Sequence, residues 1–130
     1  MDLQLVGKTA LVTGASMGIG RAIAKGLAAE GVQVIAVARR IQLLEELAGE
    51  IERGQAPRPF VITQDIMAAD APTRLRDAAI AGPGHVDILV NCAGGSRPLP
   101  LDAPEEKWEE AITLNFTRQR QITPMLSFRK

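Results

Sequence analysis

Short apolar runs alternate with longer amphipathic segments along this sequence of 130 residues. Runs of strand length separated by stretches of helix length are typical of a parallel sheet whose strands are connected by helices. The pattern predicts four strands, at residues 9–13, 33–38, 58–63 and 86–91. It also predicts four helices, at residues 18–30, 41–53, 71–81 and from 104 to the low 120s.

Turn-forming and helix-breaking residues support these boundaries. Pro57 and Pro59 limit regular pairing to the later part of the third strand, because proline has no N–H to donate. The Gly-Pro-Gly turn at residues 82–84 ends the third helix. Asp102 resembles the first residue of a capping box for the last helix, and Pro124 should bend or end that helix.

The spacing of apolar residues assigns a buried face to three of the helices, because residues three or four positions apart share one side of a helix. We expect these faces to consist of Ile19, Ile23, Gly26 and Leu27 in the first helix, Leu44, Leu47 and Ile51 in the second, and Trp108, Ile112, Asn115 and Ile122 in the last.

Right-handed crossovers allow the four strands to form one sheet in the order 3-2-1-4. This is the first half of a doubly wound α/β fold plus one strand, so residues 1–130 are interpreted as a single domain. The strand at 86–91 would lie at an open edge, with apolar side chains on its faces. Because a bare apolar edge strand favours pairing with another chain, we expect the protein to form homo-oligomers.

Composition narrows the class of protein and its partners. Hydrophobic residues make up 46% of the chain and aromatic residues only 3%, so the core should consist of small aliphatic side chains, as between a parallel sheet and its helices. The 15 basic and 15 acidic residues cancel, which argues against nucleic acid or an anionic membrane as a partner. The sequence shows neither a signal peptide at its start nor an apolar run of membrane-spanning length.

Two residues with reactive side chains are assigned structural roles. The single Cys92 excludes an internal disulfide and fits a reducing compartment, so a cytoplasmic location is expected. Its side chain is interpreted as a small buried hydrophobe. His85 has no second histidine or cysteine cluster beside it, so no metal site is predicted.

Three glycines mark the corner between the first strand and the first helix, within the segment Thr13–Gly20. Gly14 allows a tight turn with unusual backbone angles. Gly18 leaves no side chain where a phosphate would approach the backbone, and Gly20 lets the helix lie close to the strand. The helix that follows presents free N–H groups and the positive end of its dipole, which is an anion-binding site. The corner therefore predicts a site for the diphosphate of a nucleotide.

This corner and two further motifs together make the sequence resemble the short-chain dehydrogenases/reductases. The segment Thr13–Gly20 matches the family's TGxxxGxG corner. Residues 91–94, Asn-Cys-Ala-Gly, are similar to its NNAG motif, with Cys92 in place of the second Asn. Asn115 stands where the family keeps an active-site Asn on its fourth helix. The resemblance covers residues 5 to about 123 and implies a Rossmann-like fold. Within the family, the chain resembles the 3-oxoacyl carrier-protein reductases.

The resemblance also implies roles for individual residues around a dinucleotide. The pyrophosphate would be lined by Gly14, Ser16, Gly18, Ile19 and Gly20. The adenine edge would be held by Asp65 and Ile66, and the adenosine ribose would be bracketed by Asn91, Ala93 and Gly94. Asn115 would support a proton-relay water through its backbone.

The end of the second strand decides the type of cofactor. A site that prefers NAD places an Asp or Glu there to bind the ribose 2′-hydroxyl. This chain has Arg39 and Arg40 and no acid at that point. Arg39 can donate two hydrogen bonds to a 2′-phosphate, and Arg40 can stack on the adenine. The sequence therefore predicts NADP(H) over NAD(H).

Several of these residues also have a purely structural interpretation. Arg39 and Arg40 can be a solvated pair at a helix start, and Asp65 a turn-forming residue. Asn91 can brace the sheet, and Asn115 can be a core amide with satisfied hydrogen bonds.

The sequence departs from the family where its catalytic groups are expected. The family uses a Tyr as general acid, a Lys four residues later that lowers the pKa of that Tyr, and a Ser on the next strand. This chain has no tyrosine, and Leu126 stands four positions before Lys130. We interpret the sequence as a member shortened by gene truncation, frameshift or proteolysis. The 130 residues are expected to be inactive, with Asn115 a vestige of the proton relay.

Two hypotheses about function remain open. The chain is the cofactor-binding part of an oxidoreductase that transfers hydride between NADP(H) and a carbonyl or alcohol substrate, of which only residues 95–99 would border the substrate side. Alternatively, it is a non-catalytic module that binds a dinucleotide or associates with itself.

Overall fold

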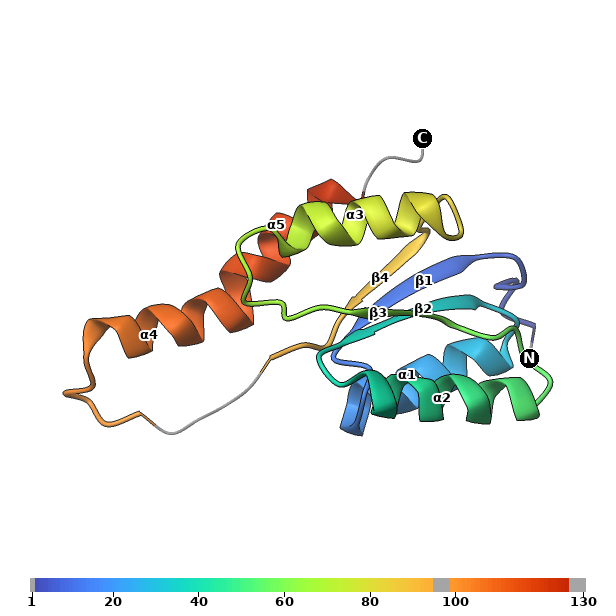
Figure 1. Cartoon of the computed structure of the whole chain (residues 1–130), viewed down its shortest axis with the longest axis horizontal. Coiled ribbons are helices and arrows are strands. Elements are labelled where there is room, and N and C mark those ends of the chain that lie inside the picture. Colours follow the sequence, from blue (N-terminus) through green and yellow to red (C-terminus); the bar gives the residue numbers. More distant parts are fainter. Residues whose placement is uncertain (1, 95–98, 127–130) are drawn as a thin grey trace.

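A four-stranded parallel sheet forms the centre of the protein (Figure 1). The computed structural model describes residues 2–94 and 99–126. The strands are β1 (Thr9–Thr13), β2 (Gln33–Ala38), β3 (Phe60–Thr63) and β4 (Ile88–Asn91). They pair in the order β3-β2-β1-β4, which confirms the predicted topology. Since all pairs are parallel, the carboxyl ends of the four strands meet at one edge.

Two of the strands begin later than the sequence pattern predicts. β3 begins at Phe60 and not at 58, directly after Pro59, which has no N–H for the ladder. β4 begins at Ile88 and not at 86, because before it the Thr9 N–H of β1 bonds to the Asp87 side chain and not to a backbone carbonyl. The Asp87 backbone N–H donates to the Thr9 carbonyl at 2.8 Å, and its carboxylate accepts from the Thr9 N–H at 2.9 Å.

Helices cover both faces of the sheet (Figure 1). α1 (Gly18–Ala29) and α2 (Ile41–Arg53) lie on one face, and α3 (Ala71–Ala81) lies on the other with the C-terminal helix α5 (Arg118–Met125). Alternate residues of each strand therefore enter two separate cores. One core contains Val12, Val34, Leu44 and Leu47, and the other contains Leu11, Ile35, Leu75 and Ile122. No helix within residues 2–94 and 99–126 is both long and apolar enough to cross a bilayer.

The buried face of α1 agrees only in part with the predicted one, since Ile23 and Leu27 are half-buried and Leu27 packs against the core. Gly20, Ala24 and Ala28 are buried there, whereas Ile19 is 76% exposed. The reason is distance, because α1 approaches the end of β1 too closely for a large side chain. A Cβ built on Gly20 would lie 2.2 Å from the Gly14 carbonyl oxygen. The predicted inner face of α2, with Leu44, Leu47 and Ile51, is confirmed.

The last helical segment is interrupted by a π-helical stretch. α4 (Glu105–Ile112) leads into η1 (Thr113–Thr117), which continues directly into α5. The wider turn rotates the buried side, so Ile122 is buried while Trp108, Ile112 and Asn115 of the predicted face are exposed. The single apolar stripe predicted for this helix was wrong for that reason.

The two ends of this helical segment also differ from prediction. Pro104, in an extended conformation, is the residue that precedes α4, and no side chain caps it. The predicted cap, Asp102, lies two residues too early, because a cap must directly precede the first helical turn. Pro124 stands inside the last turn of α5, which ends one residue later at Met125.

An ion-pair cluster joins α1 to α2 on their outer side. Glu50 pairs with Arg21 at 2.6 Å and with Lys25 at 3.1 Å. Hydrogen bonds from Arg21 and Lys25 lower the pKa of the Glu50 carboxyl from its ordinary value. The lowered pKa keeps the carboxylate ionised to a more acidic pH than usual, and its two ion pairs link α1 to α2.

Candidate functional site

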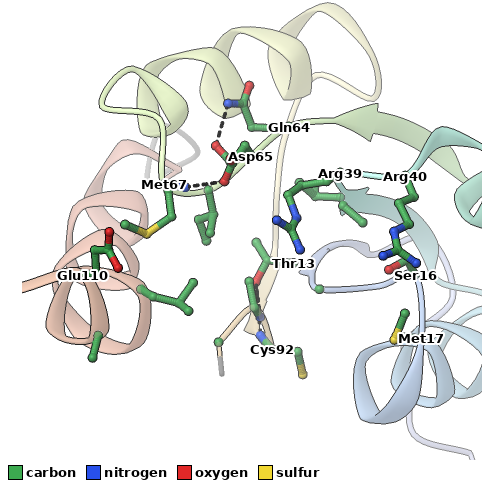
Figure 2. Close-up of a pocket in the computed structure, with 18 of the residues that line it drawn as sticks. Thr13, Ser16, Met17, Arg39, Arg40, Gln64, Asp65, Met67, Cys92 and Glu110 are labelled. Atoms are coloured by element: carbon green, nitrogen blue, oxygen red, sulfur yellow. Dashed lines mark hydrogen bonds between the residues drawn. The ribbon is translucent and has the colours of Figure 1, made fainter. Parts of the chain in front are cut away.

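A cavity of about 800 Å³ lies at the carboxyl edge of the sheet (Figure 2). Its walls come from the segments that follow β1, β2, β3 and β4 and from one side of α4. The residues predicted from the sequence that line it are Gly14, Ser16, Arg39, Arg40, Asp65, Ile66, Ala93 and Gly94. The predicted residues that do not line it are Gly18, Ile19, Gly20, Asn91 and Asn115. Of the predicted substrate-side segment 95–99, residues 95–98 lie outside the described residues, and Leu99 lines the cavity.

Gly14 forms the turn at the end of β1, with a φ of +64° that favours glycine. A Cβ at this position would lie 2.8 Å from the backbone N of Ala93 and 2.9 Å from the carbonyl carbon of Cys92. The turn is also fixed to β2, because the Ala15 N–H donates to the Val37 carbonyl at 3.1 Å. Close packing against the backbone that follows β4 therefore explains why no side chain fits at Gly14.

The other two glycines of the corner have different surroundings. Gly18 has a φ of +63° and open space where a Cβ would stand. Gly20 packs directly on the Gly14 carbonyl. Met17 precedes α1 without a side-chain cap, and the first turn of α1 contains no acidic residue. The positive end of the α1 dipole is thus not neutralised by the chain itself, which suits an anion.

Thr13 ties the ends of β1 and β4 together, a role that the sequence analysis missed. Its hydroxyl accepts hydrogen bonds from the backbone N–H groups of Cys92 and Ala93, each at 3.1 Å, and lies 3.4 Å from the Val90 carbonyl, to which it donates. The sequence signal was a hydroxyl residue directly after the apolar run of residues 10–12. Asn91, the last residue of β4, is exposed and lies opposite Thr13 in the ladder.

Arg39 and Arg40 bring two positive charges to the cavity from the end of β2. Figure 2 shows the Arg39 guanidinium pointing into the middle of the cavity and the Arg40 side chain extending toward Ser16. Both residues are exposed, and within the described part of the chain neither forms an ion pair with a carboxylate. This end of the cavity therefore attracts anions.

Asp65 begins the loop that forms the wall beyond β3. Its carboxylate accepts from the Met67 N–H at 2.9 Å, so it does form a turn, and it also faces the cavity. Gln64 is buried and donates to the Asp65 carbonyl at 2.9 Å. Met67 lies beside Glu110 of α4 on the side of the cavity away from Arg40 (Figure 2). Sequence reasoning missed Gln64 and Met67, which flank the predicted pair Asp65 and Ile66 on this loop. It also missed Glu110, because only the tertiary fold brings α4 to the cavity.

Asn115 lies in η1 and is exposed, so the interpretation as a core amide was wrong. Its side-chain N–H donates to the Ala111 carbonyl at 2.9 Å. A Cβ built on Gly94 would lie 2.8 Å from the Asn115 side-chain oxygen, so this amide stands directly against the loop after β4. The segment 91–94 thus contacts both of the other motifs, the glycine corner on one side and Asn115 on the other.

Cys92 is half-buried among these groups and is a free thiol. A Cβ on Gly20 would lie 3.3 Å from the Cys92 Cβ, so the residue packs against the glycine corner. Across residues 2–94 and 99–126, no group of three or more His, Cys, Asp or Glu residues could hold a metal ion.

A family model described as short chain dehydrogenase matches residues 8–126 of this sequence. The chain belongs to the short chain dehydrogenase family. Among curated proteins, the chain is 39% identical over 116 residues to the 7α-hydroxysteroid dehydrogenase of Escherichia coli K12, covering 88% of this chain and 44% of that enzyme. This short chain dehydrogenase therefore spans about half the length of the curated relatives it matches.

Solved structures agree with this assignment. L-sorbose reductase from Gluconobacter frateurii, in complex with NADPH and L-sorbose, matches with a TM-score of 0.90 at 33% identity, over 97% of this chain and 48% of that one. A 7α-hydroxysteroid dehydrogenase in complex with NADH and 7-oxoglycochenodeoxycholic acid matches with a TM-score of 0.91 at 34% identity, over 96% and 49% of the two chains. The predicted family and the Rossmann-like fold are confirmed.

Proposed function

We propose that the cavity of this short chain dehydrogenase binds NADP(H) in preference to NAD(H). The observation that carries the proposal is a pair of exposed arginines at the end of β2, Arg39 and Arg40, beside the glycine corner. Neither forms an ion pair with a carboxylate of residues 2–94 or 99–126. A guanidinium can donate two parallel hydrogen bonds to the 2′-phosphate that distinguishes NADP from NAD. The acid that would bind a free ribose 2′-hydroxyl is missing at this position.

The resemblance assigns parts of the cofactor to parts of the cavity. The pyrophosphate lies at the corner formed by residues 14–20, where α1 begins. The 2′-phosphate lies at Arg39, and the adenine lies between Arg40 and the loop that contains Asp65 and Ile66. The ribose lies against the segment 91–94. In this arrangement the pyrophosphate is lined by Gly14, Ser16, Gly18, Ile19 and Gly20. The ribose is bracketed by Asn91, Ala93 and Gly94.

The relatives support the cofactor class but leave its subtype open. One structural neighbour is a complex with NADPH and the other a complex with NADH, at almost the same identity to this chain. Overall similarity therefore does not choose between the two cofactors. The two arginines at the end of β2 favour NADP(H), because the arrangement proposed above puts them beside the 2′-phosphate, the one group by which the two cofactors differ.

The full activity is proposed as hydride transfer between the nicotinamide ring and a carbonyl or alcohol. In this chain Asn115 would support the proton relay, whereas a Tyr for the proton transfer is missing from the 130 residues. We therefore propose that these residues alone bind the cofactor without turning over a substrate. We also propose a cytoplasmic location, because the single cysteine of the chain, Cys92, fits a reducing compartment.

Titration with both cofactors tests this function. NADPH should raise the melting temperature of the purified chain, because a ligand that binds only the native state stabilises it by about 2.7 kcal/mol at 100 times its dissociation constant. NADH should give a smaller shift at the same concentration, and NADPH mixed with simple ketones should not be consumed. Tighter binding of NADH, or no shift with either cofactor, would contradict the proposal.

We also propose that the chain self-associates through the apolar residues that α4 and η1 leave exposed. Ile112 is 53% exposed, Phe116 is 61% exposed, and both stand on the outer side of the helical segment. Among the described residues, no strand pairs with the outer edge of β4. Burying such surfaces gains about 25 cal/mol per Å² of apolar area.

Sedimentation velocity of the chain and two variants tests self-association. The unaltered chain should sediment as a dimer or larger species, and Phe116→Glu should shift it toward monomer by at least tenfold in dissociation constant, since the new charge would be desolvated in the interface. Ile80→Glu is the control, because Ile80 is a similarly exposed apolar residue on α3, away from this surface. A monomer at high concentration would refute the proposal.

A further inference from the structure

Two consecutive residues at the start of α5 contact two different walls of the cavity. Arg118 donates from Nε to the Ile66 carbonyl at 2.7 Å and from Nη2 to the Met67 carbonyl at 3.0 Å. Gln119 donates from Nε2 to the Ala93 carbonyl at 2.9 Å. All three acceptor residues line the cavity. The Arg118–Gln119 pair thus connects the loop after β3 with the loop after β4.

No strand-to-strand hydrogen bonds could make this connection. β3 and β4 are the two outer strands of the order β3-β2-β1-β4, so their ends are about 14 Å apart across two intervening strands. Gln64 still extends the ladder, since its N–H donates to the Ala38 carbonyl at 2.9 Å. Beyond it, the carbonyls of Ile66 and Met67 receive their hydrogen bonds from Arg118. The pair therefore fixes the separation of the two walls.

The chemistry of Arg118 argues for positioning and against simple packing. The residue is 8% exposed, and within the described residues no carboxylate lies at ion-pair distance. Its third hydrogen bond, from Nη1 to the Gln121 side-chain oxygen at 2.5 Å, also goes to a neutral group. Burying a guanidinium without a counter-charge has a free-energy cost that an apolar side chain would avoid. What the guanidinium supplies is a rigid set of donors that holds two adjacent carbonyls at a fixed angle.

We propose that the Arg118–Gln119 pair sets the width of the adenosine half of the site, so that both are positioning residues for dinucleotide binding. The inference rests on the proposed function, because it takes the loop of Asp65 and Ile66 as the adenine wall. Neither side chain lines the cavity, and both donate to backbone carbonyls of its walls, so we assign neither a contact with the cofactor. They raise the affinity by holding the two walls at the distance that the adenosine needs before it arrives.

Matched arginine variants on one helix test the pair. Arg118→Met should weaken the binding of NADPH and of adenosine 2′,5′-bisphosphate by the same factor, about tenfold, in calorimetric titrations. Arg120→Met is the control, because Arg120 is the exposed neighbour and the same charged group is removed. Gln119→Leu should weaken both ligands several-fold without any change of charge. Arg118→Lys keeps the positive charge but lacks the guanidinium's planar set of donors. Its affinity for both ligands should therefore lie between that of Arg118→Met and that of the unaltered chain.

Two further measurements separate positioning from folding and from the proposed function. Binding is compared at a temperature where circular dichroism shows each variant fully folded, and hydrogen exchange of the amides of residues 64–67 is followed without ligand. Faster exchange in that loop, confined to Arg118→Met and Gln119→Leu, is the expected result. Folded Arg118→Met and Gln119→Leu that bind like the unaltered chain would overturn the inference, as would full recovery by Arg118→Lys, which would assign the effect to charge. If the unaltered chain binds neither cofactor, the proposed function fails, and the exchange rates still decide whether the pair fixes the loop.

Discussion

Replacing Gly20 by alanine should destabilise the protein by more than about 3 kcal/mol, a large part of the 5–15 kcal/mol that holds a domain of this kind together. The added Cβ would lie 2.2 Å from the Gly14 carbonyl oxygen and 2.8 Å from its carbon. Neither backbone segment can retreat. Gly14 is itself packed against the backbone of Cys92 and Ala93, and moving α1 outward would open the core beneath Ala24. Urea unfolding followed by circular dichroism measures the loss.

Gly26 provides the matched control for this prediction, since it stands in the same helix. It is exposed, and a Cβ there would meet nothing within 4 Å. Gly26→Ala should therefore stabilise the protein by about 0.5–1 kcal/mol, because alanine loses less backbone entropy than glycine in a helix. If the two variants unfold at the same urea concentration, the close approach of α1 to β1 is not the reason for glycine at position 20.

The glycine corner also shows which parts of the structure the sequence could predict. The type of residue at positions 14, 18 and 20 follows from local backbone geometry, and the structure agrees, with positive φ at Gly14 and Gly18 and close packing at Gly20. The order of the strands followed from alternating patterns and the handedness of crossovers. The buried face of α1 was predicted wrongly at Ile19 and Gly26, which are exposed, because periodicity counts side-chain hydrophobicity. It does not register how close a neighbouring backbone comes.

The walls of the cavity were predictable only where they follow a strand directly. Arg39, Asp65 and Ala93 each lie within a few residues of the end of a strand, and the carboxyl ends of parallel strands lie at one edge of the sheet. The contribution of α4 and the contacts of Arg118 depend on long-range packing. The π-helical stretch η1, which turns Arg118 inward, has no distinct periodic signal in the sequence.

Replacing Arg39 by aspartate should reverse the cofactor preference. The wild-type guanidinium offers charge-assisted hydrogen bonds to a 2′-phosphate, each contributing about 1.5–3 kcal/mol. An aspartate would repel that phosphate and instead accept a hydrogen bond from the ribose 2′-hydroxyl of NADH. Because Arg39 is exposed, water and salt reduce these energies, so we expect the ratio of NADPH to NADH affinity to fall by about 100-fold or more.

The experiment needs a control for the change of two charge units. Arg74→Asp provides it, since Arg74 is an exposed arginine on α3 that does not line the cavity. Calorimetric titration of each variant with both cofactors, at low and high salt, measures the affinities. The preference of the unaltered chain for NADPH should shrink as salt rises, because salt screens the attraction between Arg39 and the 2′-phosphate. The preference of Arg39→Asp for NADH should shrink only in part, because salt screens the repulsion of the 2′-phosphate but not the hydrogen bond to the ribose hydroxyl. An unchanged ratio in Arg39→Asp would move the 2′-phosphate away from Arg39 and leave Arg40, which extends toward Ser16, as the residue to replace next.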